Sequence, residues 1–216
     1  LVLQAGGSTR MHIDSSGNVG IGNTNPQHPL SVHLTNGQLA MFGSNGMNSP
    51  GQYAGIGLGQ VLANNTTYQK VAIVAEGRNS GSYVSNLHFL VDTAADSGSA
   101  VLADSKMMIS GGNGYVGIGT ASPERKLVLY EATSAQTQIQ FQNSTTGAAA
   151  GDGFGVGLDS AEKGFIWNYE GNDTYIGGAG GTSITIQNGG NVGIGTATPA
   201  SYSSYANNLV VYEAGH

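Results

Sequence analysis

Apolar and polar side chains alternate with a period of two along much of the chain, and one such segment occurs three times. Each copy is a glycine turn, then Val-Gly-Ile-Gly, then a short polar step into proline, at residues 17–26, 114–123 and 190–199. Successive strand side chains point to opposite faces, so Val and Ile share one face and the other is bare glycine. Strand glycine costs about 0.5–1 kcal/mol relative to alanine, so we expect another backbone or a bulky side chain to pack against the bare face.

A β-hairpin is predicted around the turn of each copy, because an apolar residue stands on either side of it. The predicted pairs are Ile13 with Val19, Ile109 with Val116 and Ile186 with Val192. A polar residue followed by proline then predicts a tight turn or one helical turn. Further strands are expected at 30–34, 127–130 and 209–212.

These landmarks divide the chain into the end of a preceding repeat (1–26), a longer first module (27–123), a second module (124–199) and the start of a further repeat (200–216). Residues 55–58 (GIGL) match residues 155–158 (GVGL), so the extra length of the first module lies after this landmark. We expect one additional strand there, from the apolar segments 70–75 and 86–91, and a longer loop near 92–104. The predicted fold is all-β, built from repeated short-stranded modules.

Composition favours association of several copies. Charged residues make up 9% of the chain, against about 25% in an average soluble protein. There are 36 glycines, without the three-residue period of collagen, and no cysteine that could form a disulfide. A single chain with short strands and so many glycines has difficulty building a core, and burial against identical chains would remedy this.

Several functions are disfavoured by charge and hydropathy. The net charge is −6 with only 7 Lys and Arg, and no basic cluster for nucleic acid is visible. No apolar run approaches the roughly 18–20 residues that cross a bilayer. The chain begins with Leu and shows no signal peptide, so we expect it to be a fragment of a longer protein.

Candidate chemistry is sparse. The glycine-rich stretches lack the spacing of phosphate loops, residues 111–114 are a poor match to calcium-binding repeats, and His12 and His33 are at most weak candidates for a metal on a symmetry axis. We expect no cofactor and no metal.

The best set for a glycosidase is Trp167, Tyr169, Glu170, Asp173 and Tyr175. We favour a plain turn rich in Asn and Asp, with Trp167 packed inside. A sugar-stacking patch of Trp167, Tyr169 and Tyr175 remains the alternative, because such rings present a flat apolar face with a polar tip.

The repeated segment resembles the GNVGIGTTSP signature in shaft repeats of tailed-bacteriophage tail fibres, and residues 10–19 resemble the RMRIDSSGNV that precedes it. The resemblance extends through most of the chain. It implies an elongated, intertwined homotrimeric fibre, assembled in the host cytoplasm and carried on the virion beside other fibre or tail proteins. The function implied is structural, a shaft that supports attachment to the host cell.

In such a trimer we expect the aliphatic residues of the three copies to form the shared core: Val19, Ile21, Val116, Ile118, Val192 and Ile194. No enzymatic activity is expected. One alternative is a receptor-binding module that contacts host surface polysaccharide through loops 43–50 and 79–83 and the Trp167 patch. A less favoured alternative is an enzyme that cleaves polysaccharide.

Overall fold

The computed structural model describes residues 1–33, 49–62, 66–79, 82–178, 181–201 and 209–211. These residues form strands and two short 3₁₀ helices, so the all-β prediction is confirmed. The chain divides into two compact units, Leu1–Leu102 and Ala103–His216. Within the described part, no helix is long and apolar enough to cross a lipid bilayer.

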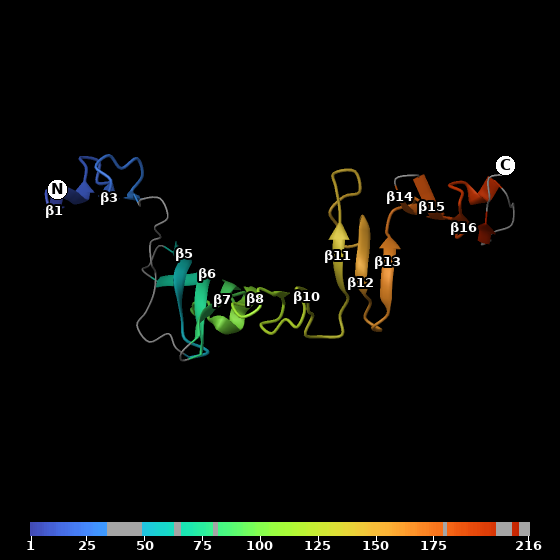
Figure 1. The fold of residues 1–216 in the computed structure, drawn as a ribbon, viewed down its shortest axis with the longest axis horizontal. Helices are drawn as coiled ribbons and strands as arrows, with labels where there is room; N and C mark the ends of the chain where they lie inside the picture. Colours follow the sequence, from blue (N-terminus) through green and yellow to red (C-terminus); the bar gives the residue numbers. More distant parts are fainter. Residues whose placement is uncertain (34–48, 63–65, 80–81, 179–180, 202–208, 212–216) are drawn as a thin grey trace. The chain divides into compact units, whose positions relative to one another are not determined.

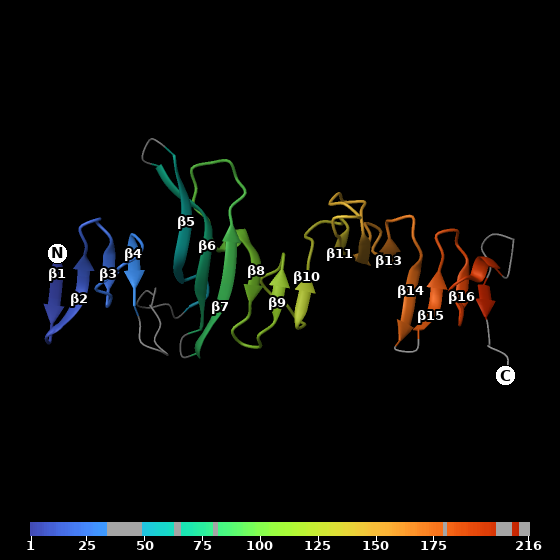
Figure 2. The same ribbon diagram turned by 90° about the horizontal axis from the view of Figure 1, so that it is seen from above.

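The first unit begins with a four-stranded sheet in chain order (Figure 2). Its strands are β1 (Val2–Ala5), β2 (Ser8–Ile13), β3 (Val19–Ile21) and β4 (Leu30–Val32). The predicted hairpin is confirmed, because β2 and β3 are antiparallel with Ile13 opposite Val19. Strand β4 then returns parallel to β3, with Leu30 opposite Val19.

The same three-strand arrangement occurs twice in the second unit. It is formed by β8 (Ser105–Ile109), β9 (Val116–Ile118) and β10 (Leu127–Leu129), and again by β15 (Gly181–Ile186), β16 (Val192–Ile194) and β17 (Leu209–Val211). Ile109 lies opposite Val116 and Ile186 opposite Val192, as predicted. The last strand of each group is again parallel to the middle strand. We call the groups β2–β4, β8–β10 and β15–β17 the repeat modules.

The glycine between Val and Ile in each module is covered by the same chain. Gly20, Gly117 and Gly193 are buried. A Cβ atom at Gly20 or Gly117 would overlap the carbonyl oxygen three residues later, and one at Gly193 would lie 2.7 Å from the corresponding oxygen of Thr196. The expectation that another backbone packs against this face is therefore confirmed, and that backbone is the chain's own turn after the strand.

The proline that ends each repeated segment is also buried in all three modules, at Pro26, Pro123 and Pro199. A Cβ atom at Gly193 would lie 3.2 Å from Cβ of Pro199. A 3₁₀ helix, η2 (Pro199–Ser201), begins at this third proline, as a cap followed by proline predicts. Burial of the proline, which in the third module lies over the strand glycine, explains why each repeated segment ends in a proline.

Three longer strands follow in the first unit: β5 (Tyr53–Leu62), β6 (Thr66–Asn79) and β7 (Ser82–Val91). They are antiparallel, with Ala72 of β6 opposite Leu90 of β7. One side of this pair carries the core cluster of Ala72, Val74, Leu90 and Ala100, against which Leu102 of η1 (Leu102–Asp104) packs. Residues 92–101 thus cover one side of β6 and β7.

The expected additional strand of the first module is not found among the described residues. Three strands follow β5 (β6, β7 and β8), and three follow its counterpart β12 (Phe154–Leu158), namely β13 (Gly164–Asn168), β14 (Thr174–Gly178) and β15. The extra length lies instead in longer strands, with 14 residues in β6 and 10 in β7 against 5 in each of β13 and β14. The longer loop after β7 is confirmed.

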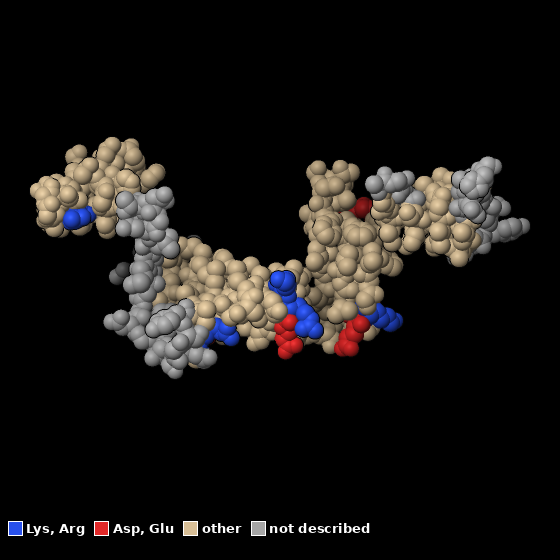
Figure 3. Space-filling model, viewed as in Figure 1, with Lys and Arg blue, Asp and Glu red and all other residues tan. Residues whose placement is uncertain are grey.

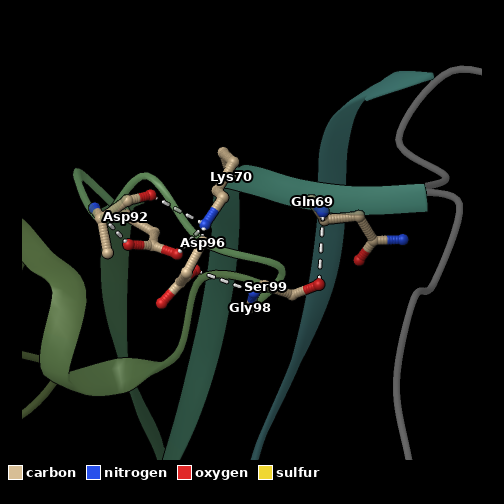
Figure 4. Close-up of polar contacts among 7 residues, drawn as sticks. Gln69, Lys70, Asp92, Asp96, Gly98 and Ser99 are labelled. Atoms are coloured by element: carbon tan, nitrogen blue, oxygen red, sulfur yellow. Dashed lines mark hydrogen bonds and ion pairs between the residues drawn. The ribbon is translucent and has the colours of Figure 1, made fainter. Parts of the chain in front are cut away.

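Lys70 holds this loop against β6 (Figure 4). Its Nζ atom lies 2.6 Å from Oδ2 of Asp92 and 2.7 Å from Oδ1 of Asp96, and donates a hydrogen bond to the Ala94 carbonyl at 3.0 Å. The hydrogen bonds from Lys70 lower the pKa of both carboxyl groups. The Ser99 hydroxyl accepts a further hydrogen bond from the Gln69 amide, so the loop is fixed at both ends.

The second unit also contains a three-stranded antiparallel sheet, in which β12 lies between β11 (Thr137–Phe141) and β13 (Figure 1). Its register places Ile139, Val156 and Ile166 in one row across the sheet. The neighbouring row contains Gln140, Gly155 and Trp167. Adjacent rows face opposite sides, so this sheet has an aliphatic side and a side of glutamine, glycine and aromatic residues.

Candidate functional site

Each repeat module exposes the side that carries its Val and Ile residues. The Val residues at 19, 116 and 192 are half-buried. The side chains of Ile21, Ile118 and Ile194 are 46%, 44% and 41% exposed, although they sit in the middle strand of their modules. We call this side the aliphatic face of a module. The predicted trimer-core residues therefore share one face in each module, and that face is open in the single chain.

Neighbouring strands extend the aliphatic face in the same way in every module. The Ile residue of the middle strand lies between an apolar residue of the preceding strand and one of the following strand. The flanking pairs are Met11 and Val32 for Ile21, Met107 and Leu129 for Ile118, and Ile184 and Val211 for Ile194. The three modules thus each present a central Ile flanked by two apolar residues, although their sequences differ.

The other strands continue this pattern. In the β11–β13 sheet the exposed row is Ile139, Val156 and Ile166. On the side of β5 and β6 away from the core cluster, Ile56 and Ile73 are paired and exposed. No charged side chain stands at these positions, and Figure 3 shows few charged side chains on the visible face of the described residues. Exposed apolar residues mark an interaction site in soluble proteins when they form a large contiguous patch.

The structure brings two of the three proposed sugar-contacting residues together. Trp167 of β13 and Tyr169, which directly follows this strand, line one shallow hollow. Tyr175 belongs to β14 in another sheet and does not line it. Trp167 is 58% exposed, so the interpretation that it packs inside is wrong. Its strand position places it on the side away from the aliphatic row.

The carboxylates of the glycosidase set have structural partners. Glu170 accepts a hydrogen bond from the Gly153 amide at 2.7 Å. Asp173 accepts one from the Asn188 amide at 3.1 Å and one from the Tyr175 hydroxyl at 3.3 Å, and its charge raises the pKa of Tyr175. Both carboxylates lie in the turn between β13 and β14, as the favoured interpretation of a plain Asn- and Asp-rich turn predicts.

Sequence reasoning missed three further residues of the hollow, which are Gln136, Asp159 and Phe165. A signal was present, because Phe165, Trp167 and Tyr169 alternate along one strand while Gly155 and Gly157 alternate along its partner. Reading both strands with a period of two would have placed the aromatic rings over a glycine stripe.

The remaining candidates are the two histidines and the two loops named from the sequence. Among the described residues, no group of three or more His, Cys, Asp or Glu could hold a metal ion. His12 stands opposite Gly20 in the sheet, and His33 donates its backbone amide to the Ile21 carbonyl at 2.8 Å. Of the two proposed binding loops, residues 43–48 and 80–81 lie outside the described residues.

Comparison with known proteins adds no relative. No protein-family model matches the chain. A search of curated proteins likewise finds no match.

Proposed function

We propose that this chain is a section of the shaft of a viral tail fibre, in which three copies associate through the aliphatic faces of their sheets. The shaft holds a receptor-binding tip away from the particle and transmits force to it. The copy number and the viral setting rest on the resemblance of the repeated segments to tail-fibre shaft repeats.

The observation that carries this proposal is the pattern of burial in the repeat modules, in which the glycine side is buried and the aliphatic side is exposed. In each module the glycine of the middle strand is buried by the chain's own turn, whereas the Ile beside it is more than two-fifths exposed. A folded chain that functioned alone would bury the aliphatic side. Covering a Val or Ile side chain stabilises a structure by roughly 1.5–3 kcal/mol, so three repeated faces supply a substantial driving force for association.

The repetition of the surface also supports association of identical chains. The aliphatic face occurs in all three modules with the same strand order and the same central Ile. A second copy of the chain carries the same series of faces and can therefore match each of them. Each module would then contact the equivalent module of the other two copies.

The experiment is the solution mass of the full chain by light scattering, before and after Ile118→Asp. We expect three times the chain mass for the unmodified protein. The variant should lose the trimer or form it only at high concentration, since it would place three carboxylates inside an apolar interior. Ser122→Asp is the matched control, because Ser122 is exposed in the turn after the same strand and should leave the mass unchanged. A monomeric unmodified chain would overturn the proposal.

A further inference from the structure

The side of the β11–β13 sheet opposite its aliphatic row has the composition of a ligand site. Phe165 and Trp167 stand on β13 and Tyr169 directly follows it, all on one side. They line a shallow, open hollow of about 390 Å³. Across the sheet from Phe165 and Trp167 stand Gly157 and Gly155, which add no side chain to this side of the sheet.

A hydrogen-bond network across the sheet fixes one end of this hollow. The Gln136 side-chain amide donates to Oε1 of Gln138 at 2.8 Å and to the Tyr169 hydroxyl at 2.9 Å, and that hydroxyl donates to Oε1 of Gln138 at 3.0 Å. The network passes over Gly155, where an added Cβ would lie 3.1 Å from Cε2 of Tyr169. The Tyr169 ring is therefore held in place before any ligand arrives, which lowers the entropic cost of binding.

Three polar groups around the rings have no hydrogen-bond partner among the described residues: Oε1 of Gln136, Oδ2 of Asp159 and Nε1 of Trp167. The first two accept hydrogen bonds and the third donates one. Flat rings combined with both acceptors and a donor match the alternating C–H and O–H groups of a pyranose sugar.

The charges around the hollow favour a neutral sugar over an acidic one. Asp159 is a lining residue, no lining residue is basic, and the chain carries a net charge of −6. An acidic sugar would be repelled here, whereas a neutral one would not. An extended chain of sugars can follow the three rings, which lie at every second residue along the strand direction.

We propose that this hollow, hereafter the aromatic trough, binds a linear neutral oligosaccharide by stacking on Trp167 and Tyr169. Gln136 and Asp159 accept hydrogen bonds from its hydroxyl groups, and the Trp167 indole N–H donates one. A proline-rich peptide could also stack on such rings. The acceptors of Gln136 and Asp159 favour the sugar, because a prolyl residue has no N–H to donate to them.

Trp167 is the only tryptophan of the chain, so the fluorescence of the protein reports on the surroundings of this one residue of the trough. The full chain is titrated with glucose, cellohexaose, maltohexaose and mannohexaose, and separately with a deca-proline peptide. We expect at least one hexasaccharide to shift the emission to shorter wavelength in a saturable manner, and glucose to bind much more weakly. No shift with any hexasaccharide, equal affinity for glucose, or a response to the peptide alone would overturn the proposal.

Calorimetry with the responding hexasaccharide then compares variants. Trp167→Ala should bind about tenfold more weakly or not at all, while Trp167→Phe, which keeps a ring, should retain most of the affinity. Tyr175→Ala is the matched control, because Tyr175 is equally exposed but lies in another sheet. Equal binding by Trp167→Ala and the unmodified chain, or loss of binding only in Tyr175→Ala, would contradict the assignment.

The solution mass of each variant separates this proposal from the proposed function. The trough lies on the side away from the aliphatic row, so the oligomeric state should be the same in Trp167→Ala as in the unmodified chain. A change of mass in Trp167→Ala would instead assign the trough to contacts between copies. A monomeric chain that still binds sugar would leave the trough intact and reject only the trimer.

Discussion

The long strands β6 and β7 and the short-stranded repeat modules bury their apolar side chains in different ways. On one side of β6, Ala72 and Val74 lie under the chain's own loop, with Leu90 of β7 fully buried beside them. In the repeat modules the chain covers only the glycine, and the aliphatic face stays open. One side of the β6–β7 pair is covered by the chain's own loop, whereas the aliphatic faces of the modules are exposed.

This difference separates two kinds of stability. Side chains beneath the loop contribute to the folding of each chain, and their effect should be independent of protein concentration. Under the proposed association, side chains on the aliphatic faces would contribute to contacts between copies, and their effect should grow as the protein is concentrated. Substitutions in the two regions therefore test the comparison directly.

The largest effect on folding is expected for Leu90→Ala. Leu90 has no exposed surface, and its truncation would leave a cavity among Ala72, Val74 and Ala100. We expect the free energy of unfolding to fall by about 2–5 kcal/mol, measured by urea titration. Val91→Ala is the control on the opposite side of the same strand, and should cost little in dilute solution. Equal losses for the two variants would show that the loop does not form a core.

A smaller effect is expected for Gly117→Ala in the second repeat module. The new methyl group would overlap the Thr120 carbonyl oxygen, so the turn must shift, at a cost of about 1–3 kcal/mol. The bulkier Gly117→Val should lower the stability further. Gly178→Ala is the matched control, because this strand glycine has no neighbour within 4 Å of an added Cβ. If both alanine variants melt at the same temperature, the turn does not pack on Gly117.

The smallest effect is expected for Lys70→Met, and it should depend on pH. Hydrogen bonds from Lys70 lower the pKa of Asp92 and Asp96, so the unfolded chain takes up protons before the folded chain does. Their contribution is present above the unfolded pKa of about 4 and is lost as pH falls through the lower folded values.

The pH dependence is tested by measuring the urea concentration at the midpoint of unfolding at neutral and at acidic pH. Lys70→Met should be less stable than the unmodified chain at pH 7, with the difference shrinking in acid. Lys106→Met, at an exposed lysine in β8, should show no such pH-dependent difference. A deficit of the same size at both pH values would mean that the ion pairs with Asp92 and Asp96 do not fix the loop.

The sequence was sufficient for the hairpins, since apolar residues on both sides of a glycine-containing turn define a register. Ile13 with Val19 and Ile186 with Val192 were found in this way. The sequence did not predict that β4, β10 and β17 run parallel to the middle strand of their modules, because a period of two reveals a strand but not its direction. Direction depends on the path of the turn that packs over the glycine.

Burial was harder to predict than pairing. Trp167 and Ile166 are adjacent, both apolar and both exposed, and the sequence does not reveal which side of the sheet each faces. The buried glycines were recognised as a bare face, but their cover is a turn only three residues away. Local backbone geometry decides this contact, and residue type alone does not encode it.

The repeat modules also bear on how the chain folds during synthesis. Within a module, each strand pairs with a strand nearby in the sequence, as Ile13 does with Val19 and Val19 with Leu30. Structures dominated by such local contacts fold quickly, because little loop entropy is lost before the first contacts form. A nascent polypeptide can therefore complete one module while the ribosome is still translating the next.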